Sequence, residues 1–118
     1  MRWASRLAVT GVTVCALLGA GPAAAGRPSL AECFEASDFI ANAARARDAG
    51  MSADSFLGRM KEDFEVIQSF PSDLRWFVHD PDDEAFLLAS AREVFAHPKT
   101  PASHRQLFLQ SCVDRMAG

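Results

Sequence analysis

The cysteines of this 118-residue chain constrain its fold more than any other feature. Cys15 lies in an apolar N-terminal leader, which leaves Cys33 and Cys112 near the two ends of the remaining chain. In an oxidising compartment, a single pair has only one intramolecular connectivity. The bridge would close a loop of about 80 residues and stabilise the fold by roughly 4–5 kcal/mol, because it restricts the unfolded chain. The alternative is two buried free thiols.

The leader has the layout of a secretory signal peptide. It opens with two arginines and no acid, continues with the uncharged run Leu7–Ala20 and ends in the small residues Ala23–Ala25. We expect residues 1–25 to be removed and residues 26–118 to form a single domain in the periplasm or outside the cell. A membrane anchor would need about 20 apolar residues, more than this run provides. A lipid on Cys15 would need a small residue before it, where Val14 stands.

Charge narrows the range of partners. The leader holds two of the 12 basic residues and none of the 15 acidic ones, so the net charge falls from −3 to about −5 on cleavage. Nucleic-acid binding needs clustered Lys and Arg that neutralise phosphates, and an anionic membrane surface needs a basic amphipathic face. The sequence has neither feature. We therefore expect no nucleic acid and no membrane contact after cleavage, and we expect the partner to be another protein.

Apolar residues recur at helical spacing in four segments, and each segment begins at a capping signal. The first is expected from Leu30 to Ala49, behind a capping box of Ser29 and Glu32. Its expected apolar face comprises Leu30, Cys33, Phe34, Ser37, Ile40, Ala41 and Ala44. The other three helices are expected to begin after Ser52, at Asp80-Pro81 and at Thr100-Pro101, and the last carries Leu107, Phe108, Leu109, Cys112, Val113 and Met116 on its apolar face.

The segment Ser72–His79 is ambiguous between a helical turn and a short extended run, and capping by Ser72 or Asp73 favours the helix. No alternating pattern of a half-buried strand is present elsewhere. The expected fold is therefore all-α, a compact bundle of four to five short helices closed by one disulfide. A Cys33–Cys112 bridge would place the first and last helices side by side and antiparallel.

Chemical motifs are scarce. The acidic run His79–Glu84 lacks the glycine that turns a calcium loop, and helix capping explains its acids. His97 and His104 do not form an i, i+4 zinc pair with each other or with His79, and His104 is expected to pack beside the disulfide. The sequence holds no Gly-x-Ser-x-Gly turn and no CxxC motif. We therefore expect no catalytic residue, no metal site and no cofactor, and we expect that the protein is not an enzyme.

The aromatic residues give the best candidates for an interface. Trp76 is the only tryptophan outside the leader, and it lies between Arg75 and Phe77. Trp, Phe and Arg dominate the binding energy of protein interfaces. Phe39 points away from the main apolar face of the first helix and would be exposed in a simple bundle. Trp76, Phe39 and Arg75 are therefore candidate interface residues, and burial of Trp76 in the core is the alternative.

Several elements together resemble a known group of proteins. Cys33 with Phe34, the stretch Ala43–Ser52, the pair Arg75-Trp76 and the late Cys112 are similar to those of small two-cysteine periplasmic helical proteins of Gram-negative bacteria, which are mostly uncharacterised. The layout is also similar to periplasmic immunity proteins and to small acid-stress chaperones of the periplasm. The absence of catalytic motifs and the expected compartment favour a non-enzymatic protein-binding module of the immunity or inhibitor type. A periplasmic stress chaperone and an enzyme without a recognisable motif are the alternatives. The resemblance carries over no binding residue.

Overall fold

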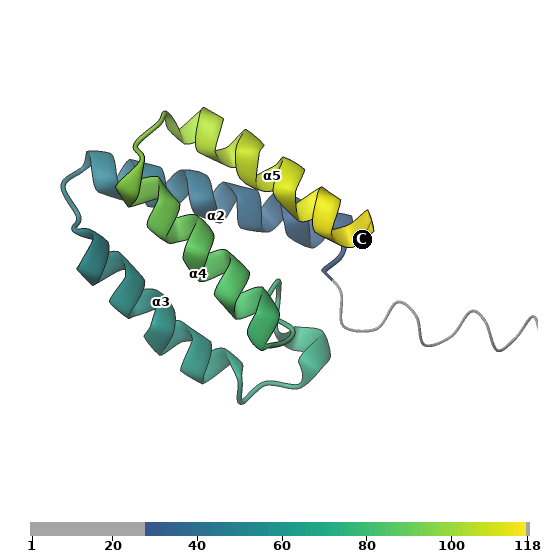
Figure 1. Ribbon diagram of the computed structural model, residues 1–118. Coiled ribbons are helices and arrows are strands. Elements are labelled where there is room, and N and C mark those ends of the chain that lie inside the picture. The colour runs from purple at the N-terminus through teal and green to yellow at the C-terminus, as the bar shows by residue number, and fades with distance from the viewer. Residues whose placement is uncertain (1–27, 118) are drawn as a thin grey trace, which may run out of the picture.

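The computed structural model describes residues 28–117 (Figure 1). The predicted signal peptide, its cleavage site and Cys15 lie outside this range. Four α-helices make up the described chain: α2 (Leu30–Asp48), α3 (Ala53–Ile67), α4 (Pro81–Ala96) and α5 (Pro101–Ala117). A single 3-10 turn, η2 (Ser72–Leu74), lies between α3 and α4. The described part contains no strand, and none of its helices is long and apolar enough to cross a membrane.

The helix boundaries follow the local capping signals. At the start of α2, the Glu32 amide donates to Ser29 Oγ at 3.1 Å and the Ser29 amide donates to Glu32 Oε1 at 2.8 Å, which completes the predicted capping box. Gly50 follows the end of α2 with a φ of 101°, a conformation that glycine adopts without steric cost. Asp80 caps α4 by accepting from the Asp83 amide at 2.8 Å. Sequence-local chemistry therefore places these helix ends.

The helices form two antiparallel pairs that are inclined to each other (Figure 1). One pair is α2 with α5, and the other is α3 with α4; α4 also packs on α2. The predicted disulfide joins Cys33, early in α2, to Cys112, late in α5, across a Cα–Cα distance of 5.8 Å. This bridge confirms the expected antiparallel placement of the first and last helices and the all-α fold closed by one disulfide.

The core lies where the two pairs meet. Its largest fully buried side chains include Phe77, Ile40 and Leu87. The ring of Phe108 from α5 contacts Phe77 and, on α4, Phe86, and so joins the two pairs. On α2 the buried face is centred on the small residues Ala36, Ala43 and Ala44, because both α4 and α5 pack against this helix. Small side chains allow such close approach. The core is therefore built mainly from α2, α4 and α5 and from the segment before α4.

The expected apolar faces were wrong at four positions. Leu30 and Phe34 are 50% and 51% exposed, and Leu107 and Val113 on α5 are 51% and 38% exposed. Helical periodicity gives the width of an apolar stripe, whereas the neighbouring helices decide where its centre lies. In α2 the centre is rotated towards the alanines, so Leu30 and Phe34 lie at its edge.

The segment Ser72–His79 is helical only at its start. Ser72–Leu74 forms a 3-10 turn that no side chain caps, and a second, non-helical turn follows it at Trp76 and Phe77. Trp76 then adopts a φ of 58°, in the left-handed region that side chains other than glycine rarely occupy. This reversal ends any helix and directs Phe77 and Val78 into the core, where both are buried.

Candidate functional site

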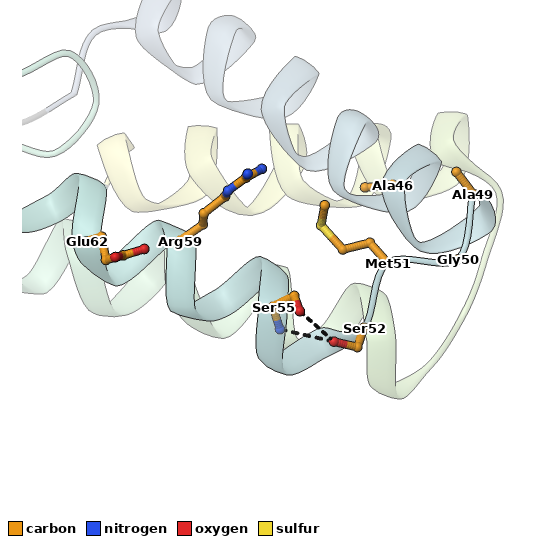
Figure 2. Close-up of a pocket in the computed structure, with 8 residues that line it drawn as sticks. All are labelled: Ala46, Ala49, Gly50, Met51, Ser52, Ser55, Arg59 and Glu62. Atoms are coloured by element: carbon orange, nitrogen blue, oxygen red, sulfur yellow. Dashed lines mark hydrogen bonds between the residues drawn. The ribbon is translucent and has the colours of Figure 1, made fainter.

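Two adjoining hollows lie beside the connection between α2 and α3. The first, of about 840 Å³, is drawn in Figure 2 and is lined by Ala46, Ala49, Gly50, Met51, Ser52, Ser55, Arg59 and Glu62. The second, of about 290 Å³, is lined by Phe39, Ala46, Met51, Phe56, Arg59, Met60 and Asp63. Ala46, Met51 and Arg59 line both. The two hollows therefore form one continuous surface, which we call the α2–α3 groove.

The groove is apolar at one end and polar at the other. Phe39, Phe56 and Met60 wall the smaller hollow. At the larger one, the Ser55 amide donates to Ser52 Oγ at 3.1 Å as the N-terminal cap of α3, and the Ser52 hydroxyl donates to Ser55 Oγ at 3.0 Å (Figure 2). Such a surface can hold an apolar side chain next to a polar group.

Arg59 is the cation of the groove. In Figure 2 its side chain extends from α3 towards α2, away from Glu62. Glu62 and Asp63 follow it by three and four residues, a spacing that often supports ion pairs on a helix. No ion pair or hydrogen bond joins Arg59 to any residue of the described chain. Its guanidinium is thus available to a group from outside.

Two of the three predicted interface residues meet beside this groove. The rings of Trp76 and Phe39 lie 5.9 Å apart in an edge-to-face arrangement, and Phe39 also contacts Phe56 at 5.7 Å. Phe56 continues the series to Phe95 at 5.6 Å. Phe39 is therefore half-buried, and the expectation that it would be exposed was wrong: α3 and the Trp76 turn cover the flank of α2 from which it projects.

Arg75, the third predicted interface residue, holds its own loop. Its Nε donates to the carbonyl of Phe70 at 2.8 Å, and its Nη2 donates to the carbonyl of Gln68 at 3.0 Å. Both carbonyls belong to the turn that leaves α3. These contacts give Arg75 a structural role in its own loop, and Arg75 does not line the groove.

A partly buried polar cluster joins three helices near the disulfide. His79 Nε2 lies 3.0 Å from Glu32 of α2, and His79 Nδ1 lies 3.1 Å from the carbonyl of Ser72. Both neighbours are acceptors, so the charged ring with two N–H donors satisfies both. Burial alone would lower the pKa of His79, but the hydrogen bond and charge of Glu32 outweigh it and raise the pKa above its ordinary value.

Asp83 at the start of α4 completes this cluster. It is 2% exposed, accepts from the His79 amide at 3.1 Å and faces Arg115 of α5 at 3.4 Å. Burial, together with the nearby carboxylate of Asp80, raises the pKa of Asp83. The ion pairs Glu32–His79 and Asp83–Arg115 connect the start of α2, the start of α4 and the end of α5. The cluster therefore holds these three helices together.

Arg47 fastens the opposite end of α2. Its Nη1 donates to the carbonyl of Val94 at 2.8 Å, and its Nη2 donates to the carbonyl of Lys99 at 2.7 Å. The Asp48 carboxylate accepts from Nε and Nη2 at 3.0 and 2.8 Å. The guanidinium thus ties the end of α2 to the last turn of α4 and to the connection before α5.

His104 lies beside this guanidinium rather than beside the disulfide. Its Nε2 faces two donors, the Lys99 amide at 2.9 Å and Arg47 Nη1 at 3.3 Å. Nε2 must therefore carry a lone pair, which makes the ring neutral with its proton on Nδ1. Burial, with the charges of Arg47 and Lys99, lowers the pKa of His104. The shared helix face of His104 and Cys112 was predicted correctly, but the polar partners of His104 were not.

Other clusters offer little chemistry. Within residues 28–117, no group of three or more His, Cys, Asp or Glu side chains is placed to hold a metal ion. His97 pairs with Glu93 one turn earlier on α4 at 2.8 Å, and both side chains are mostly exposed.

Sequence reasoning did not single out Arg47 or Arg59. Arg47 lies in the last turn of a helix, where a basic residue is ordinary. Arg59 precedes acids at pairing distance and so has the pattern of an ordinary surface cation. Only the packing of distant segments distinguishes Arg47, which bonds across helices, from Arg59, which lines the groove.

No protein-family model, no curated protein and no solved structure matches this chain. The resemblance to small two-cysteine periplasmic proteins therefore stays a prediction, and the groove has to be interpreted from its own residues.

Proposed function

We propose that this protein is an exported, non-enzymatic module that binds another protein in the α2–α3 groove. The observation that carries the proposal is the continuity of the two hollows, which places an apolar wall of Phe39, Phe56 and Met60 beside Arg59. Protein interfaces combine such an apolar centre with a polar rim. Aromatic residues and arginine are also the most frequent energetic anchors.

The immunity or inhibitor type of function predicts one tight and specific partner. One feature supports it: the Cys33–Cys112 disulfide, the cluster around His79 and the contacts of Arg47 hold α2, one wall of the groove, in a fixed place, and a preorganised surface loses less entropy on binding. Export to an oxidising compartment is part of this proposal, because the leader has the order of a signal peptide.

A periplasmic chaperone is the second candidate, and the scattered exposed side chains favour it. Large apolar residues that are at least 38% exposed occur on several elements of the described chain: Leu30, Phe34, Val66, Phe70, Leu74, Leu107 and Val113. Exposed apolar surface of this kind can bind unfolded clients. A chaperone would capture many clients weakly, and it would not depend on the groove alone.

The test is affinity capture from a periplasmic extract with four forms of the exported protein. Wild type is compared with Met51→Glu and Phe39→Ala, which change the groove, and with Leu107→Glu, which places the same new charge on exposed α5 surface. We expect one protein to be captured by wild type and Leu107→Glu and to fall at least tenfold with Met51→Glu and with Phe39→Ala.

Circular dichroism must show native helix content in every form, so that lost capture reports the surface and not unfolding. Met51 lies in the connection between helices and is only partly buried, which makes its substitution the milder of the two groove changes. A partner that Met51→Glu still captures at full strength would contradict the proposed groove. Many clients, reduced equally by Leu107→Glu, would instead support the chaperone.

A further inference from the structure

The smaller hollow sets the first requirement for the bound segment, if the α2–α3 groove is the binding surface proposed above. Its walls are Phe39, Phe56, Met51 and Met60, and its volume is about 290 Å³. Methionine side chains are flexible and adapt to the shape of an apolar guest. The hollow therefore suits one large apolar side chain, such as leucine or phenylalanine.

Arg59 sets the second requirement. It borders both hollows, and no residue of the described chain pairs with it. A guanidinium forms its strongest contacts with carboxylates, often through two parallel hydrogen bonds. Because Arg59 turns away from Glu62 and towards α2 (Figure 2), a carboxylate that entered the groove from outside would meet it directly.

The arrangement of the helices sets the third requirement. From their connection at residues 49–52, α2 and α3 diverge (Figure 1), and α4 is the helix that packs on both of them. Two diverging helices with apolar side chains between them can receive a third helix, which is a common mode of peptide recognition. In a helix, residues three or four positions apart lie about one turn, roughly 5.4 Å, from each other.

We infer that the groove binds an amphipathic helix that presents a large apolar side chain to the smaller hollow and, one turn away, an aspartate or glutamate to Arg59. A spacing of one turn is the shortest that keeps two side chains of a helix on the face turned to the groove, and Arg59 lines both hollows. Glu62 and Asp63 stand on the α3 side of the groove, so a basic residue on the flank of the same helix would match them. The inference names the partner's chemistry and rests on the proposed function.

The experiment is a selection from a displayed library of helical peptides, carried out in parallel on the wild-type exported protein and on Arg59→Glu. Wild type should enrich peptides with a large apolar residue and an acid three or four positions away. Arg59→Glu should enrich the same apolar residue with lysine or arginine in place of the acid. Each selected peptide should lose at least fivefold in affinity on the opposite protein, and Trp76 fluorescence can report the binding.

The outcomes separate the two levels of the proposal. If both selections enrich the same charge, or none, while Met51→Glu still abolishes binding, the carboxylate inference is overturned and the groove stands. If enriched peptides bind Met51→Glu as well as wild type, or if neither selection enriches any peptide, the groove itself is contradicted. The control Leu107→Glu should bind the wild-type peptides unchanged.

Discussion

Replacing Arg47 with lysine should destabilise the fold although the charge is kept. The Arg47 guanidinium serves two carbonyls and one imidazole beyond its own helix: Val94, Lys99 and His104. An ammonium on a lysine stem can keep about one of these contacts, because it lacks the planar fork. Two contacts are then lost, in a position where the arginine side chain is only 15% exposed.

The expected loss follows from these contacts. Hydrogen bonds to charged groups contribute about 1.5–3 kcal/mol each when buried. This site still touches solvent, so we take about 1 kcal/mol for each lost bond and nothing for the pair with Asp48, which is 54% exposed. Arg47→Lys should therefore lower the free energy of unfolding by about 2 kcal/mol. For a domain of this size that corresponds to a fall of roughly 8–16 °C in Tm.

Urea unfolding followed by circular dichroism, with the disulfide intact, measures this loss. The matched control is Arg105→Lys, since Arg105 pairs with Asp38 at 3.3 Å where both side chains are largely exposed. We expect the control to stay within about 0.5 kcal/mol of wild type. An Arg47→Lys protein as stable as the control would refute this role of Arg47, because it would mean that the guanidinium contributes nothing beyond its charge.

Three further predictions concern pH, the disulfide and local opening. The raised pKa of His79 means that the stability from its pair with Glu32 is fully present below about pH 6.5 and is lost as the pH rises through the pKa of the folded state. The loss of stability in His79→Gln should therefore be larger at about pH 5.5 than at about pH 8. A larger loss at the higher pH would contradict the pairing. Replacing Cys33 and Cys112 with alanine should lower stability by roughly 2–5 kcal/mol, and the oxidised wild type should show no free thiol in a thiol assay. Amide hydrogen exchange should be faster in α3 than in α2, and equal protection would show that the two helices open together.

The helix ends could be predicted because they depend on neighbours in the sequence. Ser29 and Asp80 cap their helices through amides three residues later, so the information lies within one turn. The disulfide could be predicted equally well, since a single pair of cysteines outside the leader leaves one connectivity. Its consequence, the antiparallel placement of α2 and α5, then followed without any knowledge of the core.

The segment before α4 could not be predicted in the same way. Its path depends on Arg75, which bonds to carbonyls five and seven residues earlier, and on His79, which reaches Glu32 on α2. The positive φ of Trp76 has no local signal, because glycine or asparagine would normally mark it. The burial of Phe39 was not predicted for a related reason: which flank of α2 is covered depends on where α3 lies. Tertiary contacts, rather than local helix propensity, decide the path of this segment and the burial of Phe39.

The distribution of polar links sets α3 apart from the other helices. The disulfide joins α2 to α5, the cluster around His79 and Asp83 joins α2, α4 and α5, and Arg47 ties α2 to α4 and to the start of α5. On α3 the buried residues Met60 and Phe64 contribute apolar contacts. Just after its end, Gln68 donates to Glu84 of α4 at 2.8 Å in an exposed bond, and Arg75 bonds to the turn that follows. Apolar contacts are non-directional and permit sliding that a hydrogen-bond network resists. One wall of the groove, α2, is therefore tied to its neighbours by more links than α3, and we expect the wall that carries Arg59 to be the one that adjusts when a helix binds.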